Sequence, residues 1–517
     1  MPGSGLTHDG SIREGEEYPI NRSLSSGNGV RQASAKASVS ASTTGDKNIL
    51  VVLVDYPNLP FNYSISADTH NKAYYSDLLQ DSSGLTMKKY YYDQSREKLN
   101  LSFQVIGPYT ASHNYDYYGR NDLVGDDVRA AELVNEILDD IDDSAVPAGM
   151  DNCTVIVVHS GPGEEAGKNN PPLYSDAENC IWSHRDKLSK HSFTPVEING
   201  TTYDDYLIVP EYNYYKGSYE ATIGVFCHEF GHVLGLPDAY DTYYSTTGVG
   251  QWSLMGGGSW GSAGREGIAP GADPAPLMAW ERLALGWIGE EEITLAPGKS
   301  VSHSFSNIND AEKVLSVKLT DDQYLILEGK GRNVAEDSMY VMETGLMITH
   351  LHKGILEKYW SGNRINSGSY RPHGAMVVEA VASNYKTNGL GNLWRSGNTD
   401  TNRFTTTALF RSDTLTAVSP SGKTAVASGF LIGILAAWYR GRKKLCAFLA
   451  VAALATFISM GCVISSGGGG IYDTGPNTNY YTNMTNVHSK TGDSGITIYN
   501  IRCKSDGSGS FTIRKDE

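Results

Sequence analysis

The sequence has little cysteine, with six residues in a chain of 517. So small a number excludes a disulfide-rich scaffold, in which covalent cross-links compensate for a small core. Because 40% of the residues are apolar, an ordinary share for a globular protein, we expect a buried core to stabilise the chain. Cys153 and Cys180 flank a predicted strand and the loop after it, and either a disulfide between them or two separate buried thiols fits the sequence.

Positive charge is also scarce. The chain has 42 Lys and Arg residues against 58 Asp and Glu residues, which gives a net charge of -16 and a pI near 5.3. A nucleic-acid partner requires clustered basic side chains, and the only compact basic run is Arg440–Lys444. The composition therefore argues against binding to nucleic acid.

No secretion signal is visible at the start, because the first ten residues have neither a basic beginning nor an apolar stretch. Either a signal was removed from this sequence or export takes another route. Residues 1–46 are rich in Ser, Gly, Ala and Thr and lack apolar periodicity, so they are expected to form a mobile leader.

Strand and helix patterns alternate from Asn48 onward and predict an α/β fold, a twisted mixed sheet backed by helices. Continuous aliphatic runs predict strands covered on both faces, and apolar residues at three- and four-residue steps predict helices. The predicted strands are 49–54, 99–106, 154–158 and 206–209, and the predicted helices are 126–141 and 219–234.

The second helix contains "CHEFGHVLGLPD", Cys227–Asp238. His228 and His232 are four residues apart, so their imidazoles share one helix face. Gly235 is placed to end the helix, and the turn brings Asp238 back toward the histidines. A buried core helix with two satisfied histidines is the alternative. Two nitrogen ligands, one carboxylate and an open fourth position are typical of catalytic zinc, so these three side chains are the predicted Zn²⁺ ligands.

Two further residues extend the pattern. Glu229 completes H-E-x-x-H, in which the carboxylate stands beside the metal without ligating it. The stretch "QWSLMGGGSWGS", Gln251–Ser262, is rich in glycine around Met255, as expected of a tight turn beneath a metal site. The sequence H-E-x-x-H-x-x-G-x-x-D followed by such a turn resembles a metzincin-type metallopeptidase.

More closely, the chain resembles the immune inhibitor A family of secreted bacterial zinc metallopeptidases. The resemblance covers roughly residues 47–410. It rests on five stretches: "NILVVLVDYPNLPF" (48–61), "YYYDQSREKLNLSFQVIGPY" (90–109), "VIVVHSGPGEEAG" (155–167), "IWSHR" (181–185) and "HEFGHVLGLPDAYD" (228–241).

The resemblance implies an extracellular zinc endopeptidase that acts on protein or peptide substrates. It carries the metal-ligand roles onto His228 and His232 and the general-base role onto Glu229. Asp238 is the expected third ligand, with Asp241 as its rival. Two other functions stay open: a surface adhesion or binding protein with an inactive protease-like domain, and a zinc hydrolase of cell-wall amide bonds.

The predicted domains are a metzincin-like catalytic domain at 47–290 and a mainly β accessory domain at 291–410, where strand-like runs alternate with polar turns. A linker at 411–424 and a tail of unknown role at 461–517 flank an apolar region, 425–460. The acidic run "DDIDDS" at 139–144 is interpreted as a solvated helix end, with a Ca²⁺ site as the alternative.

The apolar region consists of two runs, Ala425–Tyr439 and Leu445–Met460, on either side of the basic run. Each is somewhat shorter than the about 20 residues of a spanning helix, yet together they exceed what a core needs. A membrane hairpin, a single surface anchor, a lipoprotein-like start ending at Cys462, a junction of two reading frames and a buried helical hairpin are the alternatives. We predict membrane or cell-surface association, and that a chain ending near Arg411 stays soluble and active.

Overall fold

The computed structural model of the chain describes residues 43–61, 70–121, 127–152, 154–166, 179–212, 220–242, 248–261, 269–331, 344–367, 373–377, 481–482 and 496–515. Residues 1–42, Cys153 and the apolar region 425–460 lie outside these ranges, so the predictions made for them lie outside the described residues. Within the ranges, no helix is both long enough and apolar enough to cross a membrane.

A mixed five-stranded sheet forms the N-terminal part of the fold, in the order β2-β1-β3-β7-β4. The strands are β1 Gly45–Asp55, β2 Leu99–Thr110, β3 Val155–Pro162, β4 His184–Lys187 and β7 Asp205–Tyr212. All neighbours are parallel except β4, which pairs antiparallel with β7 at the edge. The predicted α/β class with a mixed sheet is confirmed.

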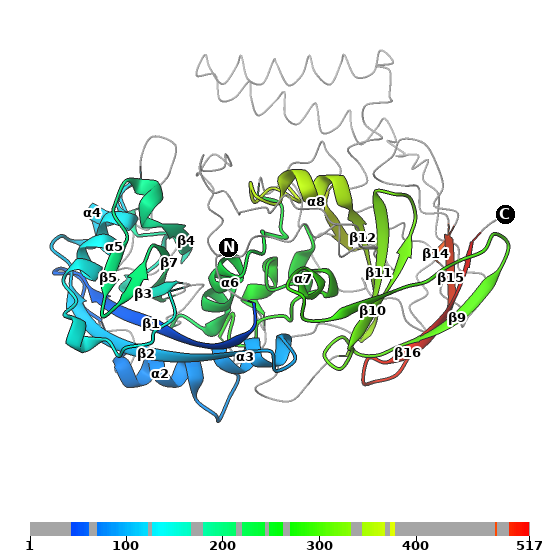
Figure 1. Cartoon of the computed structure of the whole chain (residues 1–517), viewed down its shortest axis with the longest axis horizontal. Helices are drawn as coiled ribbons and strands as arrows, with labels where there is room; N and C mark the ends of the chain where they lie inside the picture. The colour runs from blue at the N-terminus through cyan, green and yellow to red at the C-terminus, as the bar shows by residue number, and fades with distance from the viewer. Residues whose placement is uncertain are drawn as a thin grey trace, which may run out of the picture.

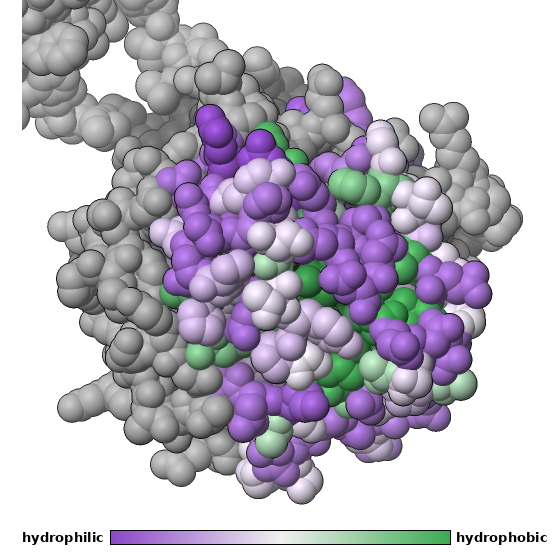
Figure 2. Space-filling model, turned by 90° about the vertical axis from the view of Figure 1, so that its left-hand side faces the viewer, coloured by the Kyte–Doolittle hydropathy of each residue, from purple (hydrophilic) through white to green (hydrophobic). Residues whose placement is uncertain are grey.

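Helices cover both faces of this sheet, as the continuous apolar strands predict. In β1, Ile49, Val51 and Leu53 face one core and the residues between them face the other. Helices α2 (Lys72–Gln80), α3 (Met87–Gln94) and α6 (Ile223–Val233) pack on the first face; α4 (Tyr115–Tyr118) and α5 (Ala130–Asp139) pack on the second (Figure 1). The end of the molecule that carries α4 and α5 is largely hydrophilic, with apolar side chains gathered in one part of it (Figure 2).

Both predicted helices are shorter than their apolar periodicity suggests. Helix α5 begins at Ala130 and α6 at Ile223, after the N-cap Thr222. Before α6 the backbone is extended along β7, where the N–H of Ala221 donates to the carbonyl of Glu211 at 2.7 Å. Apolar spacing continues through that segment, but its hydrogen bonds belong to the sheet rather than to a helix.

The described residues of the C-terminal half are mainly β and form two sheets (Figure 1). One has the order β13-β12-β11-β10-β8, and the other β14-β15-β16-β9. Their strands are β8 Gly289–Glu292, β9 Ser300–Phe305, β10 Lys313–Lys318, β11 Gln323–Lys330, β12 Gly345–His352, β13 Ala375–Val377, β14 Tyr481–Thr482, β15 Ile496–Cys503 and β16 Gly509–Lys515. The shorter elements α7 (Ala279–Ala284), α8 (Lys353–Tyr359) and the hairpin β5 (Val196–Ile198) with β6 (Thr201–Tyr203) complete the described fold.

The end of the chain is built into the accessory β region, although its sequence pattern set residues 461–517 apart as a tail. Strand β16 pairs antiparallel with β9 over six residue pairs. The two last strands also bury apolar side chains against those of β10, β11 and β12. The buried side chains are Ile496, Ile498, Ile501, Phe511 and Ile513. A domain division before residue 461 therefore separates strands that share one core.

Ending the chain at Arg411 is thus expected to destabilise the accessory region, contrary to the prediction made from sequence. The cut removes five buried aliphatic or aromatic side chains, each of which stabilises by about 1.5–3 kcal/mol when fully buried. The thermal unfolding midpoint of the shortened chain should fall well below that of the full chain. A matched control deletes only residues 425–460 and keeps both strands. Equal midpoints for all three proteins would contradict the structural role of the last strands.

Candidate metal centre

Helix α6 carries the two predicted histidine ligands. Every residue of this helix is buried, so its polar side chains are enclosed in the protein rather than solvated. The ring centroids of His228 and His232 lie 4.9 Å apart, because residues four apart occupy adjacent turns of one face.

The helix ends as the sequence predicts, at Gly235. Its φ of +92° is a left-handed conformation that favours glycine. The N–H of Gly235 donates to the carbonyl of His232, and the N–H of Leu236 donates to that of Gly231, both at 3.0 Å. This pair of bonds is the Schellman pattern of helix C-termini. The chain then reverses, and Asp238 faces the helix.

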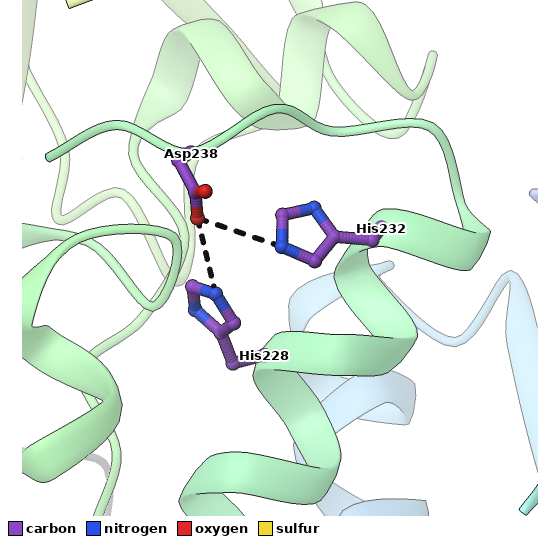
Figure 3. Close-up of side chains that lie close together, drawn as sticks. All are labelled: His228, His232 and Asp238. Atoms are coloured by element: carbon purple, nitrogen blue, oxygen red, sulfur yellow. Dashed lines mark ion pairs between the residues drawn. The ribbon is translucent and has the colours of Figure 1, made fainter. Parts of the chain in front are cut away.

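Asp238 and the two histidines point toward one another (Figure 3). The Oδ1 atom of Asp238 lies 3.2 Å from Nε2 of His228 and 3.5 Å from Nε2 of His232. Within the described part of the chain, these three form the group of His, Cys, Asp and Glu side chains whose ligand atoms lie close enough to hold one metal ion. The structure thus brings together the three ligands predicted from sequence.

Backbone carbonyls fix the tautomer of both histidines. Nδ1 of His228 lies 2.9 Å from the carbonyl oxygen of Leu254, and Nδ1 of His232 lies 2.8 Å from that of Leu236. A carbonyl oxygen only accepts, so each Nδ1 donates its proton and each Nε2 keeps its lone pair. Such outer hydrogen bonds orient histidine ligands in metal sites.

The chemistry of the group fits a zinc ion. Nε2 of His228 and Oδ1 of Asp238 are buried and have no hydrogen-bond partner among the described residues. Burial lowers the pKa of His232 and so favours its neutral, ligating form. Burial alone would raise the pKa of Asp238, but the two neighbouring histidines outweigh it and hold that pKa below its usual range, which favours the ionised carboxylate. Two neutral nitrogens and one carboxylate make a catalytic zinc set.

Glu229 lies next to His228 on α6 and is fully buried. It is not a member of the group of three metal-ligand side chains. A carboxylate in this place can serve as a base without occupying a coordination position. Asp241, the predicted rival of Asp238, is also buried and also absent from that group.

The turn around Met255 underlies the helix between the two histidines. A Cβ atom added to Gly231 would lie 2.4 Å from the sulfur of Met255, so the turn and the helix are in close contact. The carbonyl of Met255 accepts from the N–H of Ala239, at 2.7 Å, in the loop that carries Asp238. The turn therefore supports both elements that supply ligands.

A buried hydrogen-bond network links the Met255 turn to helix α7. The N–H of Met255 donates to Oγ of Ser253, at 2.9 Å, and that hydroxyl donates to the carboxylate of Glu281 on α7, at 2.6 Å. Burial raises the pKa of Glu281 to about 7, although hydrogen bonds from Ser253 and a backbone N–H oppose the shift. This contact could not be predicted from the sequence, because Glu281 lies on a separate helix.

The acidic run at 139–144 is not part of a metal-ligand group in the described residues. Asp142 accepts from the N–H of Ser144 at 2.8 Å, and Asp143 accepts from the N–H of Asn199 at 2.9 Å. These carboxylates serve as local hydrogen-bond acceptors at the end of α5.

Comparison with known proteins agrees with the site. Residues 34–151 and 142–288 match the family described as "Immune inhibitor A peptidase M6, catalytic domain". The chain carries the catalytic domain of the immune inhibitor A peptidase family. The resemblance predicted from its motifs is thereby confirmed, and all three ligand positions fall inside the matched residues.

Two relatives are similar to this chain in sequence. One is the "Pre-pro-metalloprotease PrtV" of Vibrio cholerae serotype O1, 33% identical over an alignment of 318 residues that covers 50% of this chain. The second is "Immune inhibitor A" of Bacillus thuringiensis subsp. alesti, 29% identical over an alignment of 265 residues that covers 41% of this chain. The chain spans 33% of the length of the Vibrio protein and 36% of that of the Bacillus protein.

Proposed function

We propose that this chain is a zinc-dependent endopeptidase that hydrolyses peptide bonds of extracellular proteins. The observation that carries the proposal is the convergence of three buried ligand atoms, from His228, His232 and Asp238, with both imidazole tautomers set by backbone carbonyls. The family match and the metalloprotease name of a relative support the same reaction class. The Met255 turn beneath α6 supports a metzincin-like arrangement.

His228, His232 and Asp238 would hold a zinc ion, which would supply a Lewis acid for the scissile carbonyl and lower the pKa of a water molecule. Glu229 accepts the proton of the attacking water and delivers it to the leaving nitrogen. The two hydrogen bonds from Nδ1–H to backbone carbonyls keep both imidazole rings in a fixed orientation during the reaction. The Met255 turn keeps α6 and the loop of Asp238 at a fixed separation.

The activity is tested by incubating the purified chain with a mixture of unfolded proteins, with and without a zinc chelator. We expect new internal cleavage products that disappear with the chelator and return when zinc is added. Release of amide-linked fragments from cell-wall material without protein cleavage would favour the alternative hydrolase. Absence of any cleavage by a zinc-loaded sample would favour a binding protein with an inactive domain.

We further propose that residues 425–460 attach the chain to a membrane or cell surface, because both runs are aliphatic around the whole helix circumference. The chain that lacks 425–460 and keeps the last two strands is the suitable variant. We expect the full chain to sediment with membranes and the variant to remain in the supernatant, with equal peptidase activity. A full chain found wholly in the supernatant would contradict the attachment.

A further inference from the structure

The segment after α8, residues 360–367, lies against the loop that carries Asp238. The indole N–H of Trp360 donates to the carbonyl of Gly235 at 2.9 Å. The side-chain amide of Asn366 donates to the carbonyl of Ala239 at 2.7 Å. These contacts join parts of the chain more than 120 residues apart. Trp360 and Asn366 thus bind the loop that carries Asp238, although they lie outside the predicted catalytic domain.

Asn363, in the middle of this segment, contacts the ligand itself. Its Oδ1 accepts from the backbone N–H of Asp238, and its Nδ2 donates to Oδ2 of the Asp238 carboxylate, both at 2.6 Å. The backbone N–H can only donate and an ionised carboxylate can only accept, so the orientation of the amide is unambiguous. Both side chains are buried.

The two carboxylate oxygens of Asp238 have different neighbours. Oδ2 is held by Asn363, and Oδ1 is left to face Nε2 of both histidines. A carboxylate held at one oxygen and at its own backbone N–H cannot rotate freely about its side-chain torsions. The geometry points to Asn363 as a positioning residue that aims Oδ1 of Asp238 at the metal. This inference rests on the proposed function, because it takes Asp238 to be a zinc ligand.

The backbone of Asn363 agrees with a specific need for this residue. Its φ is +53°, a left-handed conformation that asparagine, aspartate and glycine tolerate better than other residues. Aspartate therefore replaces it without backbone strain and keeps the acceptor for the N–H of Asp238. The aspartate, however, has no donor for Oδ2 of Asp238, and its carboxylate repels that of Asp238.

The test measures zinc affinity by competition with a chelator for the parent, Asn363→Asp and Asn366→Asp. Asn366 is the matched control, since it is equally buried, lies in the same segment and makes two amide hydrogen bonds, but only to the backbone of Ala239 and Ala375. We expect Asn363→Asp to weaken zinc binding by about 10- to 100-fold, the usual effect of losing an outer-shell partner. Asn366→Asp should stay within about threefold of the parent.

Asn363→Gly is a second variant that keeps the test valid if Asn363→Asp does not fold. Glycine accepts the left-handed backbone conformation and introduces no charge. We expect this variant to unfold at a metal-free midpoint close to that of Asn366→Asp and still to bind zinc about 10-fold or more weakly than the parent. Cobalt-substituted protein gives a second readout, since its visible spectrum should change in Asn363→Gly and not in Asn366→Asp.

Three results would overturn the inference. Zinc affinity equal to the parent in both Asn363 variants would remove the positioning role and leave the proposed function intact. Equal weakening in the Asn363 variants and in Asn366→Asp would show a general loss of packing instead. A parent that binds no zinc would overturn the proposed function and, with it, the role of Asn363.

Discussion

Replacing Glu229 by glutamine is expected to lower peptidase turnover by about 10²- to 10⁴-fold, the usual contribution of a positioned general base. Glutamine keeps the size of the side chain but cannot accept a proton at neutral pH. Because Glu229 is outside the group of metal-ligand side chains, the zinc content should equal that of the parent. Initial rates of protein cleavage and zinc content are measured on the same sample.

The same substitution at Glu281 is the matched control. This glutamate is also fully buried, and a pKa raised to about 7 means that its neutral form is already well populated near neutral pH. Glu281→Gln should therefore keep most of the activity. If Glu229→Gln cleaved protein as fast as the parent, the assignment of the base would be wrong.

Replacing His232 by alanine is expected to remove zinc and activity together. The change leaves two ligands of three and opens a buried space beside Asp238, whose charge then loses a neighbour at 3.5 Å. Zinc affinity should fall by more than about 100-fold, the upper end of what outer-shell changes cost. Competition with a chelator measures this affinity directly.

His159 provides the control for that experiment. It is a buried histidine on β3 whose Nδ1 also donates to a backbone carbonyl, that of Ser160 at 3.0 Å, and burial lowers its pKa to about 4. It belongs to no metal-ligand group in the described residues. His159→Ala should keep the zinc, and full zinc retention in His232→Ala as well would rule out this site.

The parts of the site that could be predicted from sequence are local. Two histidines four residues apart, the glycine that ends α6 and the aspartate beyond it all follow from helix geometry over eleven residues. Strands β1, β2, β3 and β7 of the first sheet were also predictable from their apolar runs. The edge strand β4, His184–Lys187, has no such run and was not predicted.

The long-range parts could not be predicted in this way. Asn363 reaches Asp238 across 125 positions, and it lies in a polar stretch with no periodic pattern. The pairing of β16 with β9 also joins segments about 200 positions apart. The hydrophobic pattern of one sequence shows which face of a helix or strand is apolar. It does not show which distant segment covers that face.

The metal content of the purified full chain, measured by elemental analysis after dialysis, tests the central claim most directly. The arrangement of His228, His232 and Asp238 predicts one zinc per chain, and a loss of protein cleavage in step with removal of that zinc. A preparation that cleaves protein at full rate while holding no stoichiometric metal would contradict the account.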